Sequence, residues 1–310
     1  NIITYEKIIR STENMMAQGN QINIAYLFAT LTVFGWALGI VIGRYIHAEV
    51  PPIGLTFWRW SIAGLCLMPW AFPFIREEIH LILKIKKQIL WMGIFMIGAS
   101  TLSMISVNYT KAMNVSIVNA GQPLTTALIA WLVFKEKLGK YQSFGIFLGC
   151  IGIITMASRA NITNLLELKF NIGDLIMLIA ILGFGSYANT LRTIPKELSL
   201  SSITFSVIIA GCLFLLPFYL YETIVYRPMP LDKSTIFWVI ILATLTSLIP
   251  TYLWNASVSA IGANRSAIFV NLIPVFGSTL AIIFLNEQLR FFHIIGATSI
   301  LIGILFTIRR

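Results

Sequence analysis

The chain has 310 residues, of which 57% are hydrophobic and only 11% are charged. Soluble globular domains carry about 25% charged residues, so this composition excludes a water-soluble surface. The net charge of +10 would suggest nucleic-acid binding in a soluble protein, but Lys and Arg of membrane proteins lie mainly in loops and set orientation. We therefore expect no nucleic-acid partner and a lipid bilayer around most of the chain.

The first 23 residues are polar and mixed in charge, without the short apolar core of a cleaved secretory signal, so residues 1–23 are predicted as a cytoplasmic N-terminal tail. Ten apolar runs follow, each about 18 to 22 residues long, enough for a helix to cross a hydrocarbon layer ~30 Å thick. The predicted spans are 24–46, 54–74, 88–109, 115–134, 141–158, 173–191, 201–221, 236–257, 264–285 and 292–308. Barrel strands would be shorter and alternate in character, which favours an all-α polytopic membrane protein.

Lys and Arg are distributed unequally between alternate loops. One side carries 14 of them: Lys7, Arg10, Arg76, Lys84, Lys86, Lys87, Lys135, Lys137, Lys140, Arg192, Lys196, Arg265, Arg309 and Arg310. The other side carries 7: Arg44, Lys111, Arg159, Lys169, Arg227, Lys233 and Arg290. Because cytoplasmic loops carry the excess, both termini are predicted to be cytoplasmic. Abundant Ile, Asn and Lys suggest an AT-rich bacterial source and hence the inner membrane.

An internal repeat relates the two halves. Residues of the same type recur 151 positions apart: Pro123 and Pro274, Glu136 and Glu287, Leu138 and Leu289, Gly145 and Gly296, and Gly152 and Gly303. The predicted domains are a five-helix repeat over 24–159, a linker over 160–172 and a second five-helix repeat over 173–310. An odd number of spans per repeat inverts the second half, which predicts two inverted five-helix repeats, an architecture typical of secondary transporters.

Several short motifs stand out: Phe34-Gly35-Trp36 in the first predicted span, Phe57-Trp58-Arg59-Trp60 in the second, and the stretches 132–138 and 283–289 at matching ends of the two halves. With these motifs the chain resembles the drug/metabolite transporter superfamily, specifically its EamA-type members with ten helices. Lys135 and Asn286 depart from the Gly that the family has before the repeated Glu. The resemblance implies a cavity between the halves lined mainly by helices 1, 3, 4, 6, 8 and 9. It also implies that helices 5 and 10 lie at the periphery, where they are candidates for a homodimer contact.

Arg59 is the one basic residue well inside a predicted span. Charge at such depth is costly, by about 2.5–3.5 kcal/mol on insertion scales, and marks a candidate site. Contact with an anionic substrate group and a structural tie to neighbouring carbonyls both remain open.

Two symmetric pairs are candidates for gates and hinges. Glu136 and Glu287 end helices 4 and 9, where a carboxylate can cap the next helix or gate the site, with proton coupling as the alternative. None of the 12 acidic residues lies near the middle of a span, which predicts facilitated exchange or weak coupling. Pro123 and Pro274 each remove a backbone hydrogen bond, which suits a hinge in a cavity wall or a local packing adjustment.

Uncharged polar and aromatic side chains inside the spans are further candidates for the substrate site, because their polar groups would be unsatisfied against lipid. They are Trp36, Asn108, Asn119, Gln122, Tyr187, Asn189, Trp254, Asn255 and Asn271, which join Arg59. Hydrogen bonding between helices is the alternative role of the amides. The aromatic side chains can form a wall or hold a cation.

Catalytic and metal-binding patterns are missing from the sequence. His47, His80 and His293 lie far apart at span ends, the three Cys show no ligand spacing, and no phosphate-binding GxxxxGK[ST] occurs. We expect no cofactor, no metal and no enzyme activity. The favoured function is a secondary transporter of a small polar or amphipathic metabolite, such as an amino acid or a nucleoside-like compound of the S-adenosylmethionine type. A broad-specificity drug or metabolite exporter is the alternative.

Overall fold

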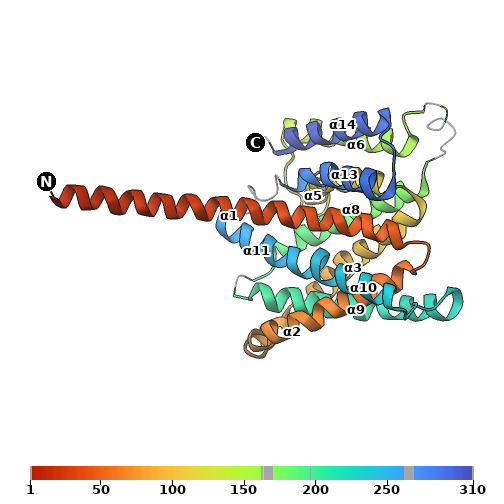
Figure 1. Cartoon of the computed structure of the whole chain (residues 1–310), viewed down its shortest axis with the longest axis horizontal. Helices are drawn as coiled ribbons and strands as arrows, with labels where there is room; N and C mark the ends of the chain where they lie inside the picture. Colours follow the sequence, from red (N-terminus) through yellow and green to blue (C-terminus); the bar gives the residue numbers. More distant parts are fainter. Residues whose placement is uncertain (1, 162, 164–169, 196, 262–268, 309–310) are drawn as a thin grey trace.

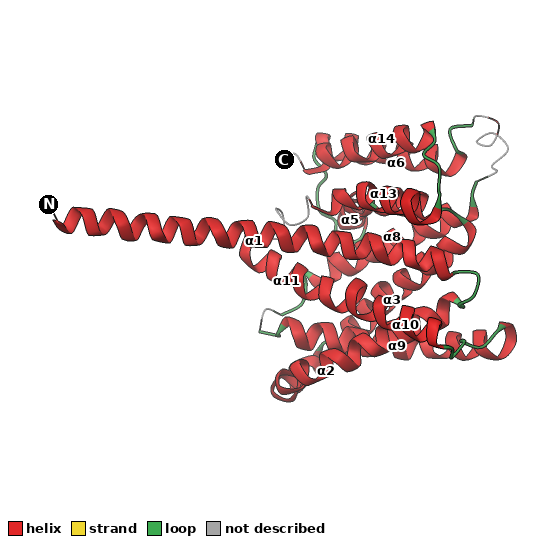
Figure 2. Cartoon of the chain, viewed as in Figure 1, coloured by secondary structure: helices red, strands yellow, loops and turns green. Residues whose placement is uncertain are grey.

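The structure is a computed structural model that describes residues 2–161, 163, 170–195, 197–261 and 269–308. Side chains are described for these residues except 2–22, 255, 259 and 308. Every regular element within these residues is a helix, and they contain no strand (Figure 2). The predicted all-α class is confirmed, as expected for a backbone that must satisfy its hydrogen bonds within each membrane segment.

The first half starts with a helix longer than its predicted span. The elements are α1 (Ile2–Ile46), α2 (Pro52–Lys84), α3 (Lys86–Tyr109), α4 (Ala112–Asn119), α5 (Gln122–Leu132) and α6 (Lys140–Ser158). The residues predicted as a tail continue α1, which projects beyond the bundle in Figure 1. The predicted fourth span is divided between α4 and α5, which are bent by 43° at their junction.

The second half contains more irregular helix. Its elements are α8 (Ile172–Leu191), α9 (Leu200–Tyr221), η1 (Glu222–Tyr226), α10 (Lys233–Ala243), η2 (Thr244–Leu248), α11 (Ile249–Ile261), η3 (Val270–Leu272), α13 (Ile273–Leu285) and α14 (Phe291–Ile308). The segments η1 and η2 are π-helical, and η3 is a short 3₁₀-helix. Side-chain caps begin three of these helices, since Asn171, Ser199 and Asp232 each accept a hydrogen bond from a backbone N–H of the first turn.

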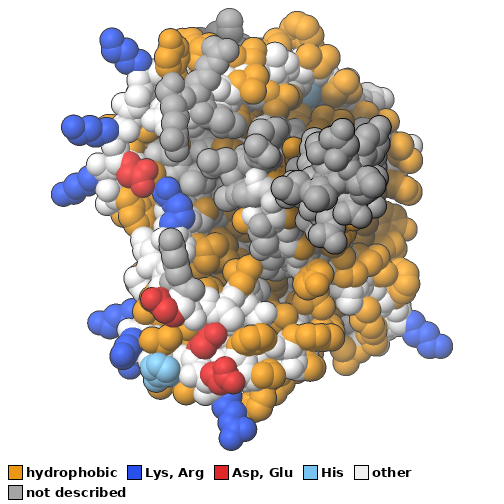
Figure 3. All heavy atoms as spheres, turned by 90° about the vertical axis from the view of Figure 1, so that its left-hand side faces the viewer, with side chains coloured by type: hydrophobic (Ala, Val, Ile, Leu, Met, Phe, Trp, Pro, Cys, Tyr) orange, Lys and Arg blue, Asp and Glu red, His pale blue; other side chains and the backbone are white. Residues whose placement is uncertain are grey.

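The ten predicted spans correspond to helices of the described residues. Six helical stretches are long and apolar enough to cross a membrane, and the bent pair α4 and α5 makes a seventh. The long helix α2 and the apolar segments Val270–Leu285 and Phe291–Thr307 complete the ten, arranged as two inverted repeats of five. We call the end of the bundle where α14 ends the terminal face, and the other end the opposite face. Lys and Arg side chains lie mainly along the left and lower edges of the terminal face in Figure 3.

Contacts between the halves come in pairs that the repeat relates. Helix α1 packs on α11 and α13, and its equivalent α8 packs on α3 and α5. Likewise α2 packs on α10, while its equivalent α9 packs on α3. Three further pairs join equivalent helices directly: α2 with α9, α4 with α13, and α6 with α14. The inverted repeat therefore describes the packing as well as the sequence.

Helices α6 and α14 cross at glycines. A Cβ atom on Gly152 would lie 2.8 Å from the carbonyl oxygen of Gly296, and one on Gly303 would lie 2.6 Å from that of Gly145. Since Gly145 and Gly296 are equivalent, as are Gly152 and Gly303, the two contacts are related by the pseudo-two-fold axis. These helices thus use their glycines within one chain, and the homodimer contact through their outer faces stays a prediction.

The largest apolar core lies between the halves. Its fully buried members include Val33 of α1, Met113 of α4, Met177 of α8, Ile273 of α13 and Ile300 of α14. Both halves contribute to it, so the middle of the bundle is formed only when they pack together. The candidate site residues are located relative to this central core.

Candidate functional site

Two helix breaks lie beside the central core, one in each half. Helix α4 ends at Asn119 and α5 begins at Gln122, so that Pro123 is the second residue of α5. Pro274 is likewise the second residue of α13, directly after the 3₁₀ turn η3. Proline has no N–H to bond the preceding turn, which accounts for a break at the same place in both halves. Symmetric interruptions of this kind are typical of transporter binding sites.

Three buried oxygen atoms near these breaks have no hydrogen-bond partner among the described residues. They are the side-chain oxygens of Ser116, Asn119 and Asn271. Ser116 is fully buried, and a Cβ atom on Gly277 of α13 would overlap its side chain, so α4 and α13 touch closely here. An unpaired buried acceptor costs about 1–3 kcal/mol. A ligand that donates hydrogen bonds to these oxygens would recover that energy.

Trp36 and Trp254 bring an aromatic pair to the same core. Their ring centroids are 5.3 Å apart with an interplanar angle of 48°, and both side chains pack against the central core. Trp36 comes from α1 and Trp254 from α11, helices of different halves. Two indole faces at the boundary between the halves can hold a flat or cationic group.

The other predicted site residues are dispersed. Asn108 donates to the carbonyl of Met104 within its own helix, and the backbone carbonyl of Gln122 accepts from the hydroxyls of Thr125 and Thr126. Tyr187 packs with a separate apolar cluster that includes Met92 and Val207. The side chain of Asn255 lies outside the described residues.

Asn189 forms hydrogen bonds within the protein through both its amide nitrogen and its amide oxygen. Its amide nitrogen donates to the carbonyls of Thr126 and Gly185, and its amide oxygen accepts from Arg192. These bonds tie α8 to α5. Both polar groups of Asn189 are therefore already bonded within the protein in this conformation.

Arg59 is buried and connects α2 to the π-helical segment η2. Its Nε donates to the Ser247 hydroxyl at 2.5 Å and its Nη2 to the Thr246 carbonyl at 3.3 Å, while the guanidinium lies 5.5 Å from the ring centroid of Trp60. In a regular α-helix the Thr246 carbonyl would accept from the N–H of residue 250, which is Pro250. Arg59 thus donates to a carbonyl to which Pro250 cannot donate. Within the described residues, no carboxylate forms an ion pair with Arg59.

Glu287 closes the opposite face at the start of α4. Its two carboxylate oxygens accept from the backbone N–H groups of Ala112 at 2.8 Å and Met113 at 3.0 Å. Free N–H groups and the helix dipole make this end of a helix favourable for a carboxylate. The bond joins the end of α13 to the start of α4, and so joins the two halves.

Glu136, the equivalent of Glu287, lies at the terminal face in a different environment. It is 55% exposed and forms an ion pair with Arg192 at 3.5 Å. The backbone before the two carboxylates is alike, since Lys135 and Asn286 have φ values of 55° and 52°. Glycine is favoured at such positive φ, so Lys135 and Asn286 occupy the same left-handed backbone position in the two halves.

A buried polar network adjoins Glu287, and sequence reasoning missed most of it. His293 accepts at Nδ1 from the N–H of Arg290, and its Nε2 bonds the amide oxygen of Asn114. The amide nitrogen of Asn114 donates to Asp174, whose carboxylate also accepts from the hydroxyl of Thr110. Since Nδ1 is an acceptor, Nε2 must carry the proton. The network locks α4, α8 and α14 together at the opposite face.

Two more carboxylates tie α2 to α9 reciprocally. Glu222, at the end of the α9 span, accepts from the N–H groups of Ile53 at 3.2 Å and Gly54 at 2.7 Å. Glu78, near the end of α2, accepts from the N–H of Ser199 at 3.0 Å, just before α9. Helices α2 and α9 are thereby joined at both faces. The sequence signal was present, since both residues are acidic at span ends, but their partners are 121 to 169 positions away.

Comparison with known proteins identifies the family. The model of the EamA-like transporter family matches residues 23–158 and again residues 171–309. The uncharacterized transporter YyaM of Bacillus subtilis is 26% identical over 216 residues, 69% of this chain and 69% of that protein. A probable amino-acid metabolite efflux pump of Salmonella typhimurium is 25% identical over 289 residues, 89% of this chain and 92% of that protein.

The fold is shared with a solved protein. Its crystal structure aligns with a TM-score of 0.58 at 16% sequence identity, covering 93% of this chain and 96% of that one. In the described residues, no group of three or more His, Cys, Asp or Glu side chains could hold a metal ion. With one family model matching both halves of a ten-span bundle, this chain belongs to the EamA-like transporter family of the drug/metabolite transporter superfamily, and it is a membrane transporter rather than an enzyme.

Proposed function

We propose that the chain is a secondary transporter that moves a small polar or amphipathic metabolite bearing a protonated amine by alternating access. Amino acids and nucleoside-like compounds such as S-adenosylmethionine are of this class. The observation that carries the proposal is the pair of unpaired amide oxygens of Asn119 and Asn271, one at each helix break. An ammonium group donates hydrogen bonds to such oxygens, and the Trp36 and Trp254 rings beside the same core suit a cation.

The Salmonella typhimurium relative supports this substrate class, since it is named a probable amino-acid metabolite efflux pump. The other candidates, Gln122, Tyr187 and Asn255, would join the site only in another conformation, while Asn108 and Asn189 would support helix geometry. Arg59 would position η2 beside the site rather than contact the substrate, because its guanidinium is engaged by Ser247 and Thr246.

In the proposed movement, the opposite face opens and the terminal face closes. Pro123 and Pro274 would act as hinges, since the helix is already interrupted at both. The bond of Glu287 to the start of α4 would open, and Glu136 would make the equivalent bond when the terminal face closes. The exposure of Glu136 here and the burial of Glu287 support this alternation.

The terminal face would be cytoplasmic, in a bacterial inner membrane. The support is the excess of Lys and Arg in the loops of that face, 14 against 7 in the sequence. Maleimide labelling of single cysteines placed at Lys137 and at Lys233 in sealed cells tests this orientation. Labelling of the first but not the second by an impermeant reagent would contradict it.

Transport into proteoliposomes tests the site. Asn119→Leu and Asn271→Leu should each raise KM for the amine substrate about tenfold, the effect of one lost bond to a charged donor. Both variants should fold at least as stably as the parent, because each removes an unpaired buried acceptor. Asn108→Leu is the matched control and should keep the parental KM. Unchanged KM in both test variants would refute the site. The substrate itself can be found by a thermal-stability screen, because binding raises stability.

A broad-specificity exporter of planar hydrophobic cations is the second candidate, favoured by the Trp36 and Trp254 pair alone. The two functions differ in their dependence on the amide oxygens. Export of ethidium that is lost in Trp254→Ala but retained in Asn119→Leu and Asn271→Leu would favour the exporter. Loss of amino-acid exchange in all three variants would favour the metabolite carrier.

A further inference from the structure

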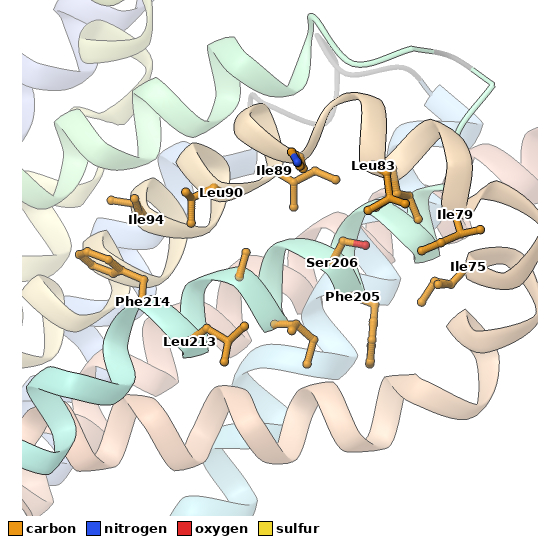
Figure 4. A pocket seen from close by; sticks show the side chains of 14 residues that line it. Ile75, Ile79, Leu83, Ile89, Leu90, Ile94, Phe205, Ser206, Leu213 and Phe214 are labelled. Atoms are coloured by element: carbon orange, nitrogen blue, oxygen red, sulfur yellow. The ribbon is translucent and has the colours of Figure 1, made fainter.

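An apolar groove of about 730 Å³ lies on the side of the bundle, between α2, α3 and α9. Twelve of its 14 lining residues are apolar, among them Ile79, Leu83, Leu90 and Phe214, which Figure 4 shows along its walls. The volume lies within the range of small-molecule sites, about 300–1,000 Å³. None of the candidate substrate residues lines it, so the groove is separate from the central site.

The groove opens sideways, toward the position of the lipid tails. Its rim side chains Leu83 and Leu213 are 58% and 64% exposed, and they belong to spans on either side of the opening. A substrate from water would meet an apolar wall there. An acyl chain in the bilayer would meet a surface of its own polarity.

Lysine stands at the terminal-face end of the groove. Lys86 lines the groove and is the first residue of α3, separated only by Ile85 from the end of α2 at Lys84. Lys84, Lys86 and Lys87 are all exposed, and none forms an ion pair within the described residues. Two carboxylates of α2 lie nearby in the sequence, and one of them, Glu78, is bound to Ser199. The negative charge of Glu77 is therefore outnumbered by the positive charges of Arg76 and the three lysines. The mouth of the groove is therefore cationic at the level of the lipid headgroups.

The groove also contains a hydroxyl without an internal partner. Ser206 of α9 is half-buried and points into the groove in Figure 4. It makes no hydrogen bond to any described residue, whereas the hydroxyl of Thr204, two residues earlier on α9, donates to the carbonyl of Leu200. A single hydroxyl donor in an apolar wall suits an apolar ligand that carries one hydrogen-bond acceptor at that position.

We propose that this groove binds an anionic phospholipid of the terminal-face leaflet. One acyl chain lies along the Ile, Leu and Phe walls, the phosphate pairs with Lys86, and a glycerol ester carbonyl accepts from Ser206. Basic residues beside apolar surface recognise anionic headgroups in this way, at about 1 kcal/mol per Lys or Arg near the surface. The lipid would brace α2, α3 and α9, which belong to both halves. This inference does not depend on which substrate is transported.

The test compares phosphatidylglycerol with phosphatidylcholine as additives to the delipidated, detergent-purified chain. Phosphatidylglycerol should raise the thermal unfolding temperature more than phosphatidylcholine does, and native mass spectrometry should detect its binding. Lys86→Gln should lose at least half of that difference, and Lys137→Gln, an exposed lysine of the same face outside the groove, should keep it.

A second variant pair tests the groove rather than the charge. Ile209→Trp should fill the opening and also abolish the phosphatidylglycerol effect. Its control, Ile240→Trp, changes an equally exposed residue on α10 and should not. Equal stabilisation by both lipids, or by soluble glycerol phosphate, would overturn the proposal. So would a full effect in Lys86→Gln, or stabilisation by a hydrophobic cation in place of the lipid.

Discussion

The guanidinium of Arg59 donates to the carbonyl of Thr246, four residues before Pro250. The bond crosses from the first half to the second and compensates for a proline in the eighth span. Arg59→Gln should therefore destabilise the chain by about 2 kcal/mol, the typical loss for a hydrogen bond from a charged group.

The Pro250→Ala background makes this prediction specific. Alanine supplies a backbone N–H to the same turn, so Arg59→Gln should cost about 1 kcal/mol less there than in the parent. Thermal unfolding of the four proteins in the cycle measures the difference. A purely additive result would mean that Arg59 does not compensate for the proline.

Glu287→Gln should weaken the closure of the opposite face. The variant puts an amide where two backbone N–H groups converge, and the expected loss is about 2 kcal/mol. Glu136→Gln is the matched control at the equivalent position, and its loss should be below 1 kcal/mol because the Glu136 carboxylate is exposed. Equal losses in the two variants, measured by thermal unfolding, would contradict the assigned difference between the faces.

The glycine crossing of α6 and α14 should not accept a methyl group. Gly303→Ala would place Cβ against the backbone of Gly145 and Gly149, and overpacking of this kind costs about 1–3 kcal/mol. Gly98→Ala is the control, since nothing lies within 4 Å of a Cβ at that position. A chain that tolerates Gly303→Ala as well as Gly98→Ala would contradict this close packing.

His47, in the loop after α1, should make stability depend on pH. Burial, aided by the charge of Arg44 and by Arg227, holds the pKa of His47 below its ordinary value of 6.5. The unfolded chain then takes up this proton first as the pH falls, so His47 contributes a loss of stability that begins near pH 6.5 and grows down to the folded-state pKa. His47→Gln should remove this part of the slope between about pH 7.5 and about pH 5.5, measured by thermal unfolding. An unchanged slope would assign it to other groups.

The fold could be predicted because its signals are local or periodic. Apolar length gave the spans, and Pro123 with Pro274 indicated matching helix interruptions. The π-helical segment η2 was missed, although Pro250 inside a long apolar run is a usable signal for a disturbed helix.

The polar contacts could not be predicted, because each depends on partners far apart in the chain. His293 was visible at a span end, yet Asn114 lies 179 positions before it. Glu78, Glu222 and Asp174 likewise acquire their partners only through packing of one half on the other. Among the candidate site residues, sequence alone did not separate Asn189, whose groups are all bonded, from Asn119 and Asn271. The sequence around an Asn does not show whether its amide is hydrogen-bonded or unpaired in the folded chain.

The caps of α2 and α4 come from residues that the ribosome adds much later. When the fourth span has been synthesised, Glu222 and Glu287 have not. The backbone N–H groups at the starts of α2 and α4 therefore lack the carboxylates that accept their hydrogen bonds in the folded chain. The first half can therefore insert into the membrane, but by itself it does not contain the carboxylates that cap α2 and α4. Completion of the early spans during biosynthesis is delayed until nearly the whole chain has been translated.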